Sequence, residues 1–184
     1  MKALDILLNR TSISQLAEPA PSSEALENLF QAALRVPDHG GLKPFRWVVI
    51  SGAGRERLSA VCYQALLARD AEADDKAQAK AQQLFLRAPM VIAVISDVQA
   101  HPKVPLLEQH ITAGLAAHAM QMAAVAQGFG GIWRTGPYAT DPLVREALAV
   151  SGDNEIVGFL YLGTPLNEKR KVPRPDSQSF TTYF

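Results

Sequence analysis

The sequence predicts an α+β fold contained in one domain. Segments whose apolar residues recur with helical spacing outnumber the segments that have the composition of strands. The strands do not alternate regularly with single helices, which favours an α+β arrangement over a doubly wound parallel sheet. The 184 residues show no internal repeat and no domain boundary, and this length can bury a sizeable core. We therefore expect a single domain over residues 1–184.

The first fifty residues contain three predicted elements separated by two loops. Ser22 followed by Glu24 is typical of a helix start, because the serine hydroxyl can cap the first turn. Val36 before Pro37 ends that helix, since a residue that precedes proline is disfavoured in the α region. The expected segments are a short helix that starts near Leu4 and ends near Asn9-Arg10, a loop over 11–21, a helix that begins after Ser22 and ends at Val36, a loop over 37–44 and a strand over 45–50.

The middle of the chain is predicted to supply a buried strand and the longest helix. Residues 88–96 are apolar nearly throughout, which is typical of a strand buried on both faces. An amphipathic helix is expected over 54–69, and the polar stretch 70–84 is predicted to be an exposed helix or a mobile lid. The helix over 104–127 is rich in alanine and ends at Gly128. Its small residues let another backbone come close, so two interpretations stay open, a central core helix and a dimer helix.

The C-terminal third is predicted to contain two strands, one helix and a tail. The strands cover 131–135 and 155–163, and Asp141 before Pro142 opens the helix between them. The last five residues, 180–184, are Phe-Thr-Thr-Tyr-Phe, a composition that favours a strand. Because an aromatic tail should not hang in water, we expect it to pair with its own sheet or with that of a second subunit.

Composition and charge argue against several function classes. Eighteen Lys and Arg balance eighteen Asp and Glu, so the chain lacks the basic surplus that nucleic acid or anionic membrane binding needs. Glu108 and other polar residues interrupt the long helix, which argues against a membrane span. Cys62 is the only cysteine, so no internal disulfide can form, which suits a reducing compartment. With no signal-like apolar run at the N-terminus, the predicted location is the cytoplasm.

Patterns for nucleophilic or metal catalysis are absent from the sequence. It contains no GxSxG elbow, no HExxH pair, no Walker loop and no CxxC pair. His110 and His118 are eight residues apart on a predicted helix, whereas ligand pairs on a helix prefer a spacing of three or four. We therefore predict neither a catalytic nucleophile nor a metal centre.

Positive and hydroxyl side chains at the ends of predicted elements are the remaining candidates. Arg10 and Ser12 flank a helix end, Arg35 lies near the end of the next helix, and Arg134 and Thr135 close a short strand. A guanidinium group matches the oxygens of a phosphate, and hydroxyls add donors. Any one of these arginines alone is more often a solvated charge or an ordinary ion pair, so both interpretations stay open at this point.

Four segments, taken together, resemble the nitroreductase family, most closely its short, YdjA-type NAD(P)H nitroreductase members. The first is Leu8-Asn9-Arg10-Thr11-Ser12, where the family has an arginine-rich motif that ends in serine. The others are Arg35 to His39 with the aromatic strand segment 43–47 that follows it, the segment 120–136, and the strand segment 156–165. They occur in the family's order over nearly the whole chain, and the ordered set is specific where each motif alone is not.

The resemblance implies a mostly antiparallel sheet between helices and an intertwined, obligate homodimer with FMN bound non-covalently at the subunit interface. It also implies an oxidoreductase that transfers electrons from NAD(P)H through the flavin to a nitroaromatic or related electrophilic acceptor. Carried over by position, the FMN-binding residues are Arg10, Thr11, Ser12, Arg35, His39, Trp133, Arg134 and Thr135. The segment that matches the nicotinamide nucleotide site consists of Ala123, Ala124, Val125, Ala126, Gln127 and Gly128.

Two positions depart from the family's pattern. Thr11 stands where close members have a second arginine, which removes one positive charge near the cofactor. Lys43 replaces the usual glutamine. Both changes bear on FMN affinity or potential, and neither affects the expected fold. The alternative function is therefore a flavin-binding or regulatory protein of the same fold with little turnover. The physiological acceptor and the choice between NADH and NADPH stay open.

Overall fold

The computed structural model describes residues 3–167 and 172–184 and confirms the α+β class. The helices are α1 (Ala3–Asn9), α2 (Ser23–Ala33), α3 (Ala53–Arg69), α4 (Asp75–Gln82), α5 (Leu106–Ala126) and α6 (Pro142–Ala147). The strands are β1 (Leu16–Ala17), β2 (Phe45–Ser51), β3 (Met90–Ser96), β4 (Gly130–Arg134) and β5 (Ile156–Pro165). Short 3-10 turns include Leu84–Arg87 before β3 and Ser177–Phe180 in the tail.

The strands form a sheet whose described pairings are all antiparallel, as the family resemblance implied. The order is β1-β5-β3-β2, and β4 pairs with β5 as well. β5 is therefore central, because it exchanges hydrogen bonds with β3, with β4 and with the two residues of β1. This arrangement places the start of β4 beside the chain that leads from α1 into β1, and Ile13 N donates to Gly131 O at 3.0 Å.

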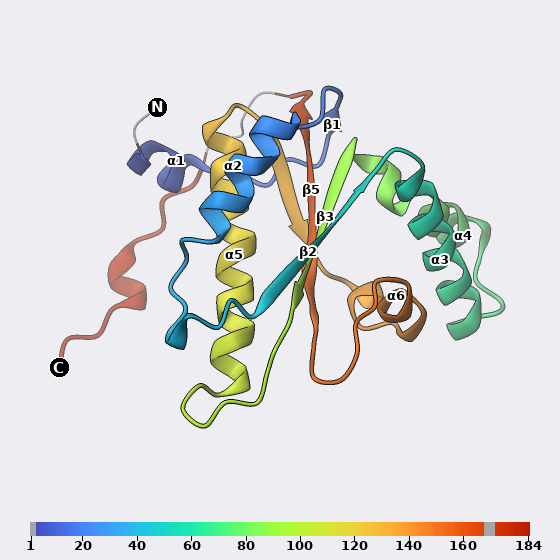
Figure 1. The fold of residues 1–184 in the computed structure, drawn as a ribbon. Helices are drawn as coiled ribbons and strands as arrows, with labels where there is room; N and C mark the ends of the chain where they lie inside the picture. The colour runs from blue at the N-terminus through green and yellow to red at the C-terminus, as the bar shows by residue number, and fades with distance from the viewer. Residues whose placement is uncertain (1–2, 168–171) are drawn as a thin grey trace.

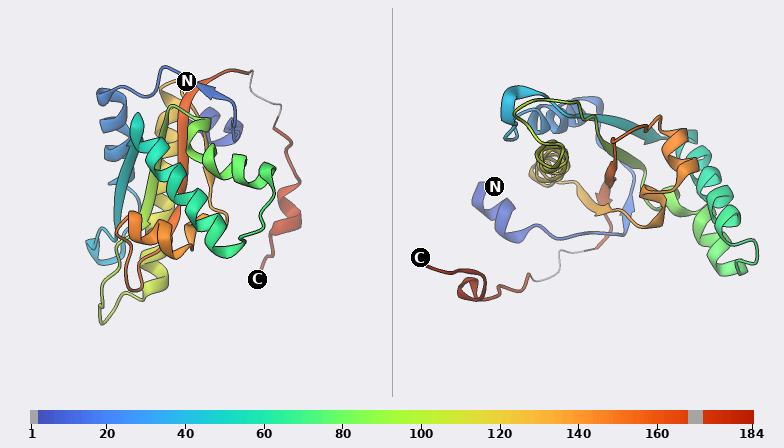
Figure 2. Two further views of the ribbon diagram at one scale, coloured as in Figure 1. Left: turned by 90° about the vertical axis from the view of Figure 1, so that its right-hand side faces the viewer. Right: turned by 90° about the horizontal axis from the view of Figure 1, so that it is seen from below.

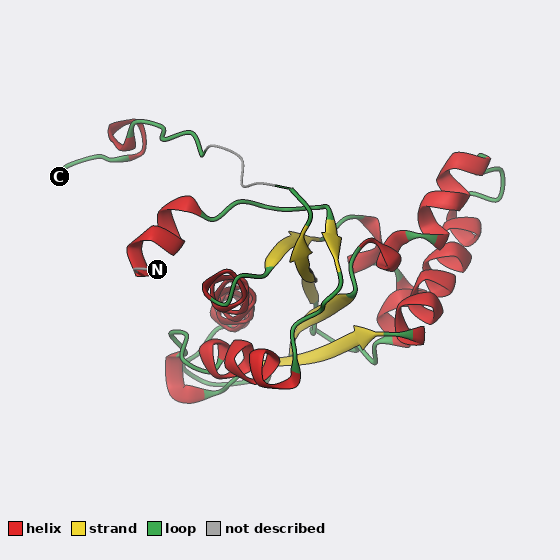
Figure 3. Ribbon diagram, turned by 90° about the horizontal axis from the view of Figure 1, so that it is seen from above, coloured by secondary structure: helices red, strands yellow, loops and turns green. Residues whose placement is uncertain are grey.

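Helices cover both faces of the sheet (Figures 1 and 3). On one face α2 and α5 pack through Leu29 and Met120 against Ile92 of β3 and Leu160 of β5. On the other face α3 and α6 pack against the opposite residues of the same strands, and α4 packs beside α3. β3 is buried along its whole length, which confirms the prediction of a strand that is apolar on both faces.

Helix α5 is a core helix, and it also leaves an apolar side exposed. One side is part of the core, where Ala116, Ala117 and Met120 are at most 1% exposed. The other side exposes Leu107 at 68% and Ile111 at 52%. Among the described residues, no helix is both long and apolar enough to cross a bilayer. The exposed apolar side of α5 is thus available to a partner of this chain.

The predicted helix starts are confirmed by their caps. The Ser22 hydroxyl accepts a hydrogen bond from Ala25 N at 3.2 Å. The Asp141 carboxylate accepts one from Leu143 N at 3.0 Å, with Pro142 in the first turn of α6. Each side chain satisfies a backbone donor that the first turn of a helix leaves without a partner.

Three parts of the fold differ from the sequence-based expectation. β1 lies inside the predicted loop 11–21, where its two residues pair with Thr164 and Pro165. The polar stretch 70–84 contains the expected, mostly exposed helix as α4, but Ala73 and Ala81 are buried, so the stretch also contributes to packing. The tail does not join its own sheet. Residues 177–180 form a 3-10 turn, and the segment extends away from the sheet (Figure 2) with Tyr183 91% exposed.

Candidate functional site

A hollow of about 440 Å³ lies between the end of α1, the middle of α5 and the end of β4. Its volume is within the range of small-molecule sites. The residues that line it are Arg10, Ser12, His118, Gln121, Trp133 and Thr135. Four of these six belong to the predicted set. His118 and Gln121 were missed, although they lie three residues apart and therefore on one face of α5.

Local hydrogen bonds hold the Arg10 segment beside β4. Arg10 N donates to Ile6 O at 3.0 Å, so Arg10 follows directly on the last turn of α1. Its Nη1 donates to the Ser12 hydroxyl at 3.5 Å. Ile13, which directly follows Ser12, donates its backbone N–H to Gly131 O of β4. A guanidinium and a hydroxyl are therefore fixed together at the edge of the hollow.

The side chains at the floor of the hollow donate hydrogen bonds to backbone carbonyl groups. Gln121 is 4% exposed, and its amide donates to Gly131 O at 3.3 Å. The Trp133 indole donates to Val157 O at 3.3 Å. A Cβ added at Gly158 would overlap the indole Nε1, so the position of Trp133 depends on a residue without a side chain at 158.

The donors at this site fit an anionic group. Arg10 supplies a cation and Ser12 a hydroxyl, and the residues that line the hollow include no carboxylate. The Thr11 hydroxyl is buried and has no hydrogen-bond partner in the described part of the chain. Thr11 does not line the hollow, so a ligand there would reach this hydroxyl only if the segment moved. The residues present thus match the phosphate or the polar edge of a flavin mononucleotide.

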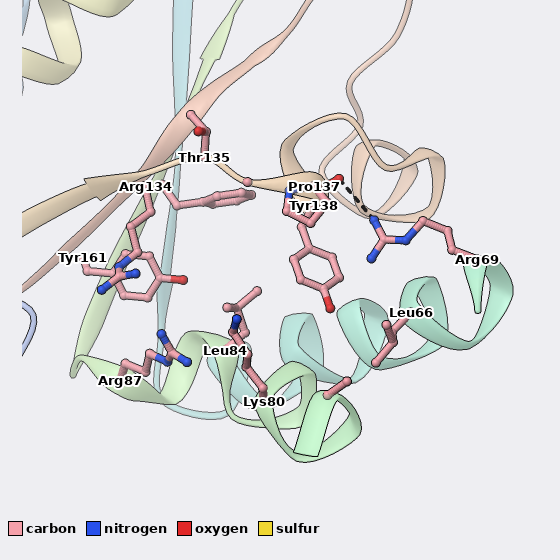
Figure 4. Close-up of a pocket in the computed structure, with 13 residues that line it drawn as sticks. Leu66, Arg69, Lys80, Leu84, Arg87, Arg134, Thr135, Pro137, Tyr138 and Tyr161 are labelled. Atoms are coloured by element: carbon pink, nitrogen blue, oxygen red, sulfur yellow. Dashed lines mark hydrogen bonds between the residues drawn. The ribbon is translucent and has the colours of Figure 1, made fainter. Parts of the chain in front are cut away.

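Arg134 lies away from this hollow. Its guanidinium is on the opposite face of the sheet, above the Tyr161 ring at 6.0 Å from the centroid. There it lines a second pocket of about 470 Å³ beside α3 and α4 (Figure 4). Thr135 lines both spaces. Side chains alternate across a strand, so the Trp133 and Arg134 side chains cannot share one face of β4.

Arg35 and His39 are also outside the hollow within one chain. Arg35 is exposed just after the end of α2. His39 Nδ1 lies 2.7 Å from Glu108 Oε2, in the first turn of α5. No described hydrogen bond, ion pair or pocket joins either residue to Arg10. Arg10, Ser12, Trp133 and Thr135 of the predicted FMN set line the hollow. Arg35, His39 and Arg134 lie outside it.

The segment that matches a nicotinamide nucleotide site forms the last turn of α5 and the residues after it. Ala124 is fully buried and Val125 is 7% exposed. The Gln127 amide donates to Ala25 O at 3.2 Å and accepts from Asn28 at 3.0 Å, which ties α5 to α2. The observed contacts of these residues are structural, and their role in nucleotide binding stays a prediction.

The sequence of the chain matches one protein family over most of its length. Residues 7–164 match the model of the Nitroreductase family. The chain belongs to this family. Its fold agrees, because the crystal structure of a nitroreductase-like family protein from Bacillus cereus superposes with a TM-score of 0.85 at 19% identity. That alignment covers 100% of this chain and 96% of the other.

Relatives within the nitroreductase family extend over the full length of the chain. An Escherichia coli K12 protein, named Putative NAD(P)H nitroreductase YdjA, is 51% identical over 100% of both chains. A Haemophilus influenzae protein with the same enzyme name is 35% identical over 100% of both. An FMN and NADPH-dependent nitroreductase, NfnB from sphigopyxis sp. strain HMH, has a TM-score of 0.78 at 18% identity and covers 100% and 99% of the two chains. The chain is thus an oxidoreductase of the nitroreductase family.

Proposed function

We propose that this protein binds FMN and uses it to carry electrons from NAD(P)H to a nitroaromatic or related electrophilic acceptor in the cytoplasm. The observation that carries the proposal is the hollow in which Arg10 and Ser12 lie beside Trp133 and Thr135. These are residues at which the family resemblance places the flavin. The names of the full-length relatives support NAD(P)H as the electron donor.

The residues of the chain would bind and orient the cofactor. Arg10 would donate charge-assisted hydrogen bonds to the phosphate or to the pyrimidine edge, and the hydroxyl of Ser12 would add a donor beside it. Trp133 already donates to Val157, so it would act as a wall. When bound, FMN supplies the two-electron chemistry, which explains why the sequence needs no nucleophile of its own.

A homodimer would complete this site. Arg35 and His39 do not reach the hollow of their own chain, so we propose that they reach the hollow of a second copy. The surfaces that would meet are apolar. Exposed large apolar residues concentrate on α1, on the outer side of α5 and in the tail: Leu4, Leu7, Leu8, Leu107, Ile111, Phe180, Tyr183 and Phe184. Apolar surface of this extent is typical of an interaction site.

Steady-state kinetics test the proposed turnover. The FMN-loaded protein should oxidise NADPH or NADH faster when a nitroaromatic acceptor is added, and the acceptor should be reduced in proportion. Arg57→Ala, at an exposed arginine of α3 that does not line the hollow, should behave as the wild type. FMN binding without any nucleotide oxidation would contradict the enzyme proposal and favour the flavin-binding alternative, which the change at Thr11 motivates.

A further inference from the structure

The second pocket, beside α3 and α4, gathers positive charge without any acidic residue in its lining. It measures about 470 Å³ and is bounded by α3, α4, the 3-10 turn Leu84–Arg87 and the connection from β4 to α6. Its basic residues are Arg69, Lys80, Arg87 and Arg134. Arg69 is already paired with the buried carboxylate of Asp141, at 3.4 Å. In the described part of the chain, the other three make no ion pair or side-chain hydrogen bond.

The two unpaired arginines converge on Tyr161. Figure 4 shows the Arg134 guanidinium over the Tyr161 ring and Arg87 below it in the view, and the Tyr161 hydroxyl points into the pocket. Arg134 Nε is buried without a hydrogen-bond partner among the described residues. Burial raises the pKa of the Tyr161 phenol, while the charges of Arg134 and Arg87 act in the opposite direction. The phenol therefore keeps its proton at neutral pH and offers a hydrogen-bond donor next to two cations.

The pocket leaves three cations without an acidic partner in its lining. Lys80, Arg87 and Arg134 face one space although the net charge of the chain is zero. A buried guanidinium nitrogen without a partner adds the cost of an unsatisfied donor. A single anion between Arg87 and Arg134 would supply the missing counter-charge, and the planar guanidinium groups match a carboxylate in particular.

The remaining walls suit a flat apolar body. Leu66, Leu84, Pro137 and the rings of Tyr138 and Phe159 line the space next to the cations. Aromatic side chains bind planar rings through stacked or edge contacts. The pocket thus offers a cationic end and an apolar end, in a volume typical of sites for small organic molecules.

We propose that this pocket binds a small planar aromatic carboxylate. Its carboxylate accepts hydrogen bonds from Arg134, Arg87 and the Tyr161 hydroxyl, and its ring lies against Leu84 and Tyr138. Lys80 is exposed at the mouth and attracts the anion. The inference concerns binding only, at a site on the opposite face of the sheet from Arg10, and it holds whether or not the protein turns over a nitroaromatic compound.

Calorimetric titration of the purified protein with 2-naphthoate, and with the neutral isostere 2-naphthamide, tests the proposal. Naphthoate should bind at one site per chain, more weakly at high salt, and at least about tenfold more tightly than naphthamide. Arg87→Ala combined with Lys80→Ala should weaken naphthoate binding by about tenfold or more, whereas Arg57→Ala should leave it unchanged. Both pocket residues are exposed, so these variants should keep the wild-type melting temperature.

Two results would overturn this assignment. Equal affinities of the wild-type protein for naphthoate and naphthamide would show that the cations do not recognise the carboxylate. This comparison requires no variant protein. Loss of naphthoate binding in Arg10→Ala, with full binding in the Arg87 and Lys80 variant, would place the anion in the hollow beside α1. An Arg87→Lys variant that binds between wild type and Arg87→Ala would support the proposal, because lysine keeps the charge and loses the planar fork.

Discussion

Trp133 and Arg134 are neighbours in β4, yet their side chains serve opposite faces of the sheet. The Trp133 indole packs toward α5 and donates to Val157 O at 3.3 Å. The Arg134 guanidinium lies on the α3 side, 6.0 Å from the centroid of the Tyr161 ring. One short strand therefore supplies a wall to the hollow beside Arg10 and a cation to the pocket beside α4.

The place of Trp133 depends on Gly158, which gives a first prediction. A methyl group at 158 would overlap the indole, so Gly158→Ala should lower the free energy of unfolding by roughly 1–3 kcal/mol. Gly114 of α5 also faces Trp133, but an added Cβ would lie 3.7 Å away, an ordinary contact. Gly114→Ala should therefore be neutral or stabilising by up to about 1 kcal/mol, since alanine favours the helix. Urea unfolding of both variants checks the contrast, and equal effects would contradict it.

A second prediction concerns Arg10 and the cofactor. Loss of one charge-assisted contact costs roughly 1.5–3 kcal/mol, so Arg10→Ala should weaken FMN binding by about one to two powers of ten. The variant should purify nearly colourless, while Arg57→Ala should keep its flavin. The measurement is the flavin content per chain from the absorbance of matched preparations. Full occupancy in Arg10→Ala would remove Arg10 from the site.

Complementation tests whether the site is shared between two copies. Arg10→Ala and Arg35→Ala should each bind FMN poorly when purified alone. Co-expressed with different tags, they should form mixed dimers in which one hollow carries both changes and the other carries neither. With random pairing, about one site in four should then bind FMN normally. If Arg10 and Arg35 acted within a single chain, co-expression would restore no binding.

The buried thiol predicts a pH dependence of stability. Burial, with a smaller contribution from Asp141, raises the pKa of Cys62 from 9.0 to about 12. Between these values the unfolded chain loses this proton and the folded chain keeps it. The free energy of unfolding should therefore fall as the pH rises above about 9, by at most about 1.4 kcal/mol per pH unit from this group.

Cys62→Ala isolates that contribution. At neutral pH the variant should be less stable than the wild type, because it leaves a small void in a fully buried position. The difference in the free energy of unfolding between the wild type and the variant should become smaller between about pH 8 and pH 10.5, since alanine has no proton to lose. Urea unfolding of both proteins at the two pH values measures this difference. Parallel loss of stability in the two proteins would show that Cys62 does not titrate in this way.

Apolar patterning was enough to predict the framework. The buried strand, the long helix and the caps at Ser22 and Asp141 follow from local rules that the tertiary structure obeys. β1 could not be predicted, because a strand of two residues is too short to show an alternation of apolar and polar positions. Leu16 and Ala17 are extended through their pairing with β5. The tail composition favours a strand, but the tail pairs with no strand of its own chain and forms a 3-10 turn instead.

The candidate site could be predicted only as a set of residues. The family's motifs brought Arg10 and Ser12 together with Trp133, and the structure places these three around one hollow. The separation of Arg134 follows from the two-residue period of a strand. The contact between Gln127 and α2 could not be predicted, because it joins positions 102 residues apart.

The absorbance spectrum of the purified protein, before and after NADPH is added without oxygen, tests the central claim most directly. The purified protein should show the bands of an oxidised flavin, which denaturation releases as free FMN, and the nucleotide should bleach those bands. A colourless protein that takes up no added FMN would contradict the proposed cofactor and with it the proposed activity.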